Sequence, residues 1–318
     1  MKGGLLLSAS THPQNTVPDG FQRAIGKPFG RLRRGETPAC IEICLYVSLM
    51  FALLLHTNLT MSAASAACRL FVTAVLPGLM PYMVLSLMLV SRVRRMSPTL
   101  VMLLGWGGGS PTGARLLPMC TGLPRKEQVR IAVSCATMSP MFLLGTVGGW
   151  LGSRIAGLVC LISVIASGWL TGLLAGTRAH TSNSEFRIPN SELFPSLSFG
   201  SAVEQSARTM LLVCGTMVML WVFAALAAEA LPSAVILPVT TLLEVTTGAS
   251  EIARLPLPLS LRTALLAGAT GFGGMAIVLQ NRAVYPPSFL TLGAQIIWQA
   301  LHGIISFLIA LGAMTMLC

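Results

Sequence analysis

Long apolar stretches alternate with short polar connections along the chain from residue 40 onward. A helix that spans a bilayer needs about 20 consecutive, mainly apolar residues. Seven stretches meet this requirement, and they cover residues 41–59, 69–90, 129–150, 155–176, 207–230, 260–280 and 289–317. The pattern predicts an all-α, polytopic membrane protein with about seven transmembrane helices.

Two further apolar segments, 97–119 and 234–253, are each interrupted in the middle by glycine together with threonine or proline. Glycine adopts backbone conformations that a helix does not, so these segments fit re-entrant hairpins better than full spans. In the first segment, Ser110-Pro111 is typical of a helix start, because serine accepts from free N–H groups and proline needs no hydrogen bond there. We therefore expect two short helices around an unwound tip at residues 107–110.

The distribution of positive charge also favours the hairpins. Cytoplasmic segments of membrane proteins carry an excess of lysine and arginine. With a cytoplasmic N-terminus and two re-entrant hairpins, most of the 21 lysine and arginine residues fall in predicted cytoplasmic segments. If residues 97–119 formed a full span instead, Arg178, Arg187 and Arg208 would move to the outside.

The predicted elements occur twice in the same order, as a span, a hairpin and two further spans. The first unit enters the membrane from outside and the second from inside, and inverted repeats with discontinuous helices are typical of secondary transporters. The predicted organisation is a basic, disordered cytoplasmic tail with the start of the first helix over 1–40, the first transmembrane helix and an external loop over 41–68, a first repeat over 69–176, a cytoplasmic linker over 177–206, and a second, inverted repeat over 207–318.

Four breaks in the apolar pattern are expected to converge in such a fold. Two are the hairpin tips at 107–113 and 244–250, and two interrupt spans at 138–140 and 271–274. Ser139-Pro140 repeats the serine–proline pattern of the first tip, so two half-helices would begin at these serines. Free N–H groups and the positive end of a helix dipole suit an anionic group. The sequence therefore predicts a central site for a small organic anion.

Glu244 lies within an apolar run at the start of the second tip, where a carboxylate is costly. It is interpreted either as a pathway or coupling residue or as a structural cap on the turn that follows it. Gln280 is interpreted either as a solute contact or as an interfacial residue. The candidate substrate-binding residues are Ser110, Thr112, Gly113, Ser139, Glu244, Thr246, Thr247, Gly273, Gly274 and Gln280.

Composition agrees with a membrane protein, because 54% of the residues are hydrophobic, 10% are charged and the mean hydropathy is +0.77. The net charge of +11 follows membrane topology and does not indicate nucleic acid, since no aromatic residues are interleaved with the basic ones. The eight cysteines form no metal-binding pattern, so no metal and no cofactor are expected. Gly108–Arg115 lacks the lysine and hydroxyl of a phosphate-binding loop, and no nucleophile–base pattern appears, so we expect no enzyme.

The same breaks carry a family resemblance. Gly108–Ala114 is similar to a Ser-Gly-Tyr-Pro-x-Gly-Ala motif, and Ser139–Phe142 is similar to a Ser-Pro-x-Phe segment. Leu243–Gly248 resembles Leu-Glu-x-Thr-Thr-Gly, and Phe272–Gly274 with Gln280 resembles Phe-Gly-Gly…Gln. These motifs are those of the sporulation integral membrane protein family typified by YlbJ, whose members carry a nucleoside-recognition Gate domain. The resemblance implies that the two repeats are Gate-like.

The chain departs from the family pattern at three positions. Gly108 and Ser110 stand where the family tends to have serine and tyrosine, and Val278 stands where a histidine is common. If that tyrosine and histidine contact the solute in the family, the specificity of this chain differs.

The resemblance implies transport of dipicolinic acid during sporulation, by a carrier or gated pore in the mother-cell-derived outer forespore membrane. The alternatives are a nucleoside or nucleobase transporter and a non-transporting membrane protein that assembles or regulates sporulation complexes. The expected partners are the lipid bilayer, the small organic anion, and either further copies of the chain or other sporulation membrane proteins, but not nucleic acid.

Overall fold

The computed structural model describes residues 39–93, 97–119, 123–179, 197–285 and 289–317, and the expected tail over 1–38 lies outside them. The chain divides into two compact units, Met1–Leu55 and His56–Cys318. In the first unit the described part is a single apolar helix, α2 (Ala39–Leu55), whose side chains are largely exposed.

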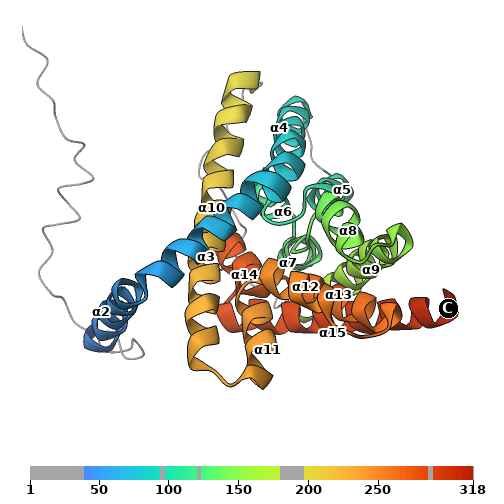
Figure 1. The fold of residues 1–318 in the computed structure, drawn as a ribbon. Coiled ribbons are helices and arrows are strands. Elements are labelled where there is room, and N and C mark those ends of the chain that lie inside the picture. The colour runs from blue at the N-terminus through green and yellow to red at the C-terminus, as the bar shows by residue number, and fades with distance from the viewer. Residues whose placement is uncertain (1–38, 94–96, 120–122, 180–196, 286–288, 318) are drawn as a thin grey trace, which may run out of the picture. The chain divides into compact units, whose positions relative to one another are not determined.

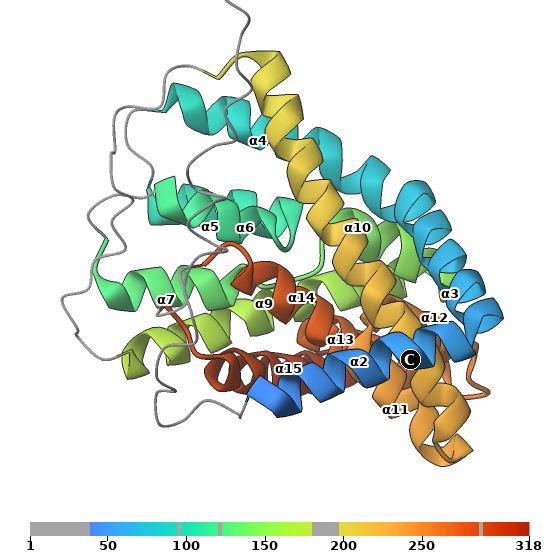
Figure 2. The same ribbon diagram turned by 90° about the vertical axis from the view of Figure 1, so that its left-hand side faces the viewer.

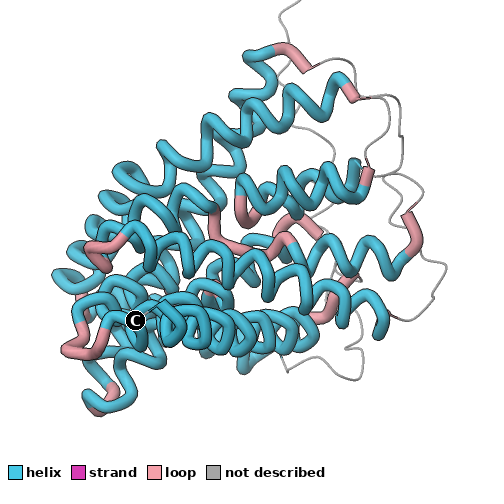
Figure 3. The backbone as a smooth tube through the Cα atoms, turned by 90° about the vertical axis from the view of Figure 1, so that its right-hand side faces the viewer, coloured by secondary structure: helices cyan, strands magenta, loops and turns pink. Residues whose placement is uncertain are grey.

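The second unit contains the rest of the described chain, which forms helices and loops without strands (Figure 3). Figure 1 gives the helix labels in chain order. The elements are α3 (Thr57–Leu70), η1 (Phe71–Val75), α4 (Leu76–Arg92), α5 (Pro98–Gly108), α6 (Thr112–Leu116), η2 (Leu117–Met119), α7 (Arg125–Ser134), η3 (Phe142–Val147), α8 (Gly148–Trp150), α9 (Arg154–Arg178), α10 (Phe199–Ala230), α11 (Ser233–Leu243), α12 (Val245–Arg254), α13 (Leu259–Phe272), α14 (Gly274–Arg282) and α15 (Leu292–Leu317).

Membrane-protein character is evident in helix length and composition. Within the described residues, five helical segments are long and apolar enough to cross a membrane: Thr57–Arg92, Arg154–Arg178, Phe199–Ala230, Leu259–Arg282 and Leu292–Leu317. The prediction of an all-helical membrane protein agrees with this result. The count of seven spans plus two re-entrant hairpins stays a prediction.

Residues 60–68 differ from expectation, because they were predicted as a loop and are helical in α3. This segment contains four alanines within the helical run Thr57–Leu70, and alanine has the highest intrinsic helix propensity. The helix continues through a π-helical turn, η1, into α4. The apolar pattern did not predict this helix, because small residues such as alanine and serine add little to the hydrophobicity of a segment.

Both interrupted apolar segments form a helix, a break and a second helix that packs against the first. In the first pair, α5 ends at Gly108 and α6 begins at Thr112; in the second, α11 ends at Leu243 and α12 begins at Val245. Each pair is followed by a broken helical segment and then by a long helix, which is α9 in the first half and α15 in the second. The order of elements in the second half therefore resembles that in the first, whereas the division into two inverted repeats stays a prediction.

Small residues allow the helices around the breaks to pack closely. Helix α9 packs against α7, α13 and α15 (Figure 2). A β-carbon at Gly172 of α9 would overlap the Ser134 hydroxyl of α7, and one at Gly303 of α15 would lie 2.8 Å from the Gly268 oxygen of α13. Such glycine contacts are typical of helix interfaces in membranes. They bring the segments that end at the breaks into direct contact.

The apolar side chains form two buried cores. One lies among α4–α7 and α10, and the other among η3, α9, α12, α13 and α15. Leu79 and Met217 of the first core and Phe142 of the second line the same cavity. The breaks therefore meet where the two cores adjoin.

Candidate functional site

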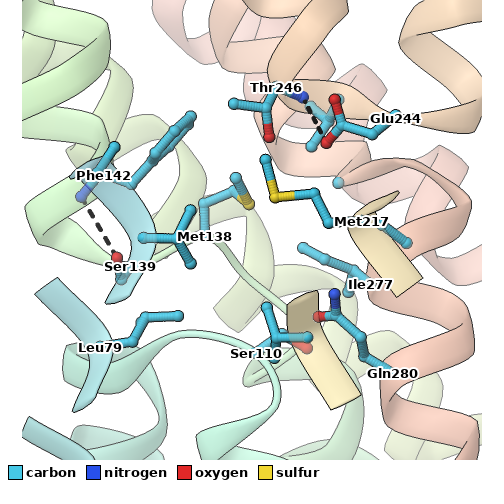
Figure 4. Close-up of a pocket in the computed structure, with 16 residues that line it drawn as sticks. Leu79, Ser110, Met138, Ser139, Phe142, Met217, Glu244, Thr246, Ile277 and Gln280 are labelled. Carbon is cyan, nitrogen blue, oxygen red and sulfur yellow. Dashed lines mark hydrogen bonds between the residues drawn. The ribbon is translucent and has the colours of Figure 1, made fainter. Parts of the chain in front are cut away.

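All four breaks contribute residues to one cavity of about 60 Å³, the central cavity. Ser110 comes from the first hairpin break, Ser139 from the break before η3, Glu244 from the second hairpin break and Gly273 from the break between α13 and α14. Figure 4 shows Glu244 with Thr246 at one end of the cavity and Ser110 with Gln280 at the other. The predicted convergence of the four breaks agrees with this geometry.

The first break is held by hydrogen bonds to distant parts of the chain. The Ser110 N–H donates to the Thr137 carbonyl over 2.7 Å, and the Ser110 hydroxyl donates to Asn281 Oδ1, also over 2.7 Å. Helix α6 is preceded by Pro111, which makes no side-chain cap. The prediction that Ser110 caps this helix is wrong, because its hydroxyl is engaged by an amide from α14 instead.

Ser139 follows the predicted pattern. Its hydroxyl accepts the Phe142 N–H over 3.3 Å, and Pro140 is the first helical residue (Figure 4). A serine that accepts an N–H group three residues later is an N-cap. The helix that begins here therefore has its positive end at the central cavity.

Glu244 separates α11 from α12 and is almost fully buried, with 1% of its surface exposed. Oε1 accepts the Thr246 N–H over 3.0 Å, while Oε2 accepts the Thr247 N–H over 2.7 Å and the Thr247 hydroxyl over 2.9 Å. The cap interpretation is confirmed by these contacts. The carboxylate also lines the central cavity, so a role in the pathway remains compatible with the cap.

On α14, Gln280 lines the central cavity and donates from Nε2 to the Thr216 hydroxyl over 3.0 Å. Thr216 was not among the predicted residues. It lies within α10, a continuous apolar helix of 32 residues, where no break or charge marks it. The Thr216 hydroxyl donates to the α10 backbone, as a threonine in any helix can. Its contribution to the site becomes visible only through the hydrogen bond that it accepts from Gln280 of α14.

The remaining predicted residues do not line the central cavity. Thr112 packs against Gly108, and Gly113 packs against Cys135. Thr247 supports Glu244 through its N–H and hydroxyl groups. Gly274 allows close backbone contact, because a β-carbon there would lie 3.1 Å from the Val245 nitrogen. These four residues position the cavity wall without forming it.

Among the described residues that line the central cavity, Glu244 is the only ionisable one, and the rest are neutral polar or apolar side chains such as Met138, Met217 and Ile277. Two hydrogen-bonded N–H groups and the positive end of α12 stabilise the carboxylate. Any solute in this cavity therefore lies beside the Glu244 carboxyl group.

The Ser110–Asn281 hydrogen bond gives a first testable prediction. Ser110→Ala should lower the free energy of unfolding by about 1–3 kcal/mol, because it leaves the buried Asn281 Oδ1 without its donor. Asn281→Ala should have a similar effect, and the double variant should cost less than the sum of the two. Thermal unfolding in detergent micelles measures all three.

Ser62→Ala is the matched control, because the Ser62 hydroxyl is exposed and bonds only to its own helix. The prediction fails if Ser110→Ala lowers the free energy of unfolding no more than Ser62→Ala does, and if the effects of Ser110→Ala and Asn281→Ala simply add in the double variant. The hydrogen bond would then contribute nothing to stability.

The fold and the central cavity define a class: an all-helical protein with long apolar helices, compatible with an integral membrane location, and with broken helices around a buried carboxylate. No group of three or more His, Cys, Asp or Glu side chains that could hold a metal occurs in the described part of the chain. Comparisons with family models, curated proteins and solved structures find no match to the chain.

Proposed function

We propose that the chain is a membrane carrier or gated pore for a small organic anion, with dipicolinic acid as the expected solute during sporulation. The observation that carries the proposal is the meeting of four helix breaks at one buried cavity. Irregular backbone is tolerated at membrane depth only where protein buries it or where it lines a water-filled cavity. A purely structural membrane protein gains nothing from such an arrangement.

The helix that begins after Ser139 supports an anionic solute, because its positive end faces the central cavity. The choice of dipicolinate rests on the motif resemblance. A nucleobase is the competing solute, since the Gln280 amide and the Ser110 hydroxyl are neutral polar groups of the kind that contact bases.

The central cavity is too small for the proposed solute unless its walls move apart. Its volume of about 60 Å³ is well below the ~300–1,000 Å³ of typical small-molecule pockets. An aromatic dicarboxylate enters only if the walls separate. The breaks at Gly109 and Gly273, both with positive φ, are the places where the backbone can change direction.

Glu244 implies that a cation accompanies the anion. Two negative charges in a medium of low dielectric constant repel each other strongly. We expect uptake of the anion to proceed with a cation that neutralises Glu244, either a proton on the carboxylate or a metal ion beside it. Uptake should then depend on an imposed cation gradient.

The test is uptake of labelled dipicolinate into vesicles that hold the purified protein, under imposed proton and sodium gradients. We expect time-dependent uptake above that of protein-free vesicles, stimulated by one of the two gradients. Excess unlabelled nucleobase should leave it unchanged, and strong competition would favour the nucleobase instead. If folded protein took up no label under either gradient, the non-transporting assembly role would be the better explanation.

A further inference from the structure

A second, smaller cavity of about 20 Å³ lies between α7, α14 and α15. Its polar lining residues are Asn281, Tyr285, Gln295 and Gln299, and Trp298 contributes an aromatic wall. None of the predicted site residues lines it. We call it the amide cavity.

The amide cavity contains buried polar atoms without hydrogen-bond partners. Both side-chain polar atoms of Gln295, Oε1 of Gln299 and the Tyr285 hydroxyl have none, although each side chain is more than nine-tenths buried. Leaving a buried polar group unpaired is costly, and nearly all such groups in proteins are paired. Four such atoms around one cavity indicate that a polar solute or water pairs with them there.

A hydrogen bond joins the lining of the amide cavity to that of the central cavity. Asn281 lines the amide cavity, Ser110 lines the central cavity, and the Ser110 hydroxyl donates to Asn281 Oδ1. The adjacent residue Gln280 lines the central cavity, so one turn of α14 borders both. This bond therefore lies between the two linings.

Three arginines contact residues that line the amide cavity or lie next to its lining. Arg178 lies over the Trp298 ring, 6.0 Å from its centroid, and Arg282 donates to the Leu290 carbonyl over 3.1 Å. Trp298 and Leu290 both line the cavity. The third, Arg125, donates to the Phe289 carbonyl, and the Phe289 ring packs against Tyr285.

The charges of these arginines persist at neutral pH. Burial lowers the pKa of Arg125, but an arginine side chain stays protonated in proteins. The described lining of the amide cavity contains no acidic side chain, and the three arginines add positive charge beside it. Clefts lined by one sign of charge concentrate ions of the opposite sign.

We propose that the amide cavity is a vestibule that receives a small organic anion from the arginine-bordered side and passes it to the central cavity when the Ser110–Asn281 hydrogen bond opens. The arginines attract the anion, and Gln295 Nε2 and the Tyr285 hydroxyl donate hydrogen bonds to it. This inference rests on the proposed transport function, but it concerns a separate group of residues.

Thiol labelling tests the vestibule independently of transport. Six of the eight cysteines are replaced by alanine, leaving buried Cys135 and Cys160, and this parent serves as the blank. Gln295→Cys and Gln299→Cys are then labelled in freeze–thawed vesicles with anionic and cationic methanethiosulfonates of similar size. Each rate is normalised to the rate with a free thiol in solution.

We expect the anionic reagent to label both positions about tenfold faster than the cationic one, because electrostatic focusing concentrates anions by at least that factor. Ser306→Cys, on the same helix but buried against Ser167, should label no faster than the blank. Removing one exposed rim charge with Arg178→Gln should reduce the preference. Equal normalised rates for the two reagents, or no labelling at positions 295 and 299, would overturn the vestibule.

The gate is tested at Met217→Cys in the central cavity. Adding Asn281→Ala should raise its labelling rate roughly fivefold, the factor expected for loss of one buried hydrogen bond. An unchanged rate in a protein that still unfolds cooperatively would overturn the gate.

Dipicolinate uptake in the same vesicles separates the two proposals. Anion-selective labelling without uptake supports the vestibule and contradicts the proposed solute. Uptake without labelling supports the solute and overturns the vestibule.

Discussion

Gly109→Ala should destabilise the protein by about 2–6 kcal/mol, because backbone strain and overpacking each contribute about 1–3 kcal/mol. Gly109 has φ of 67° and ψ of −171°, a conformation that residues with a β-carbon rarely adopt. A β-carbon there would lie 2.6 Å from the Ser139 nitrogen, so it would also push the break at Gly109 away from the break at Ser139. Thermal unfolding in detergent micelles should show a large drop in midpoint, with loss of monodisperse protein on size-exclusion chromatography.

Gly149→Ala is the matched control. Gly149 is helical in α8, and a β-carbon there would meet no atom within 4 Å. Because alanine favours helix over glycine by about 1 kcal/mol, this variant should be neutral or slightly stabilising. Similar unfolding midpoints for the two variants would show that the protein does not require the close approach of Gly109 to Ser139.

Glu244→Gln should remove the dependence of dipicolinate uptake on the cation gradient, since a neutral amide does not repel the anion and needs no cation to neutralise it. A glutamine oxygen can still accept an N–H group at the start of α12. The variant should therefore fold with a loss of stability of about 1 kcal/mol. Uptake under imposed gradients and thermal unfolding, measured on the same preparation, separate the two effects.

Glu251→Gln on the same helix is the control, because that carboxylate is exposed and pairs with the exposed Arg254. It should leave uptake and its cation dependence unchanged. Uptake by Glu244→Gln that still followed the cation gradient would exclude Glu244 as the coupling group.

The positions of the breaks could be predicted because their causes are local. Glycine, proline and a serine cap act within a few residues, so Ser139 and the interruption at Gly273 followed from the sequence. Glu244 was identifiable because a carboxylate within an apolar run is costly. Its two interpretations could not be separated without the contacts to Thr246 and Thr247.

The contacts between breaks could not be predicted, because they join residues far apart in the chain. The hydrogen bond between Ser110 and Asn281 spans 171 positions, and no local pattern selects that partner over the residues that α6 offers. Thr216 and the amides of α15 lie in continuous apolar helices, where a single polar residue has many possible roles. The packing of helices from distant parts of the chain determines which partners these polar residues have.

Each of the two apolar cores contains side chains from both halves of the chain. One core combines Val101 with Val213, and the other combines Leu143 with Leu266. Each half therefore buries part of its apolar surface against the other. A sequence change in either half is thus expected to alter packing that stabilises both.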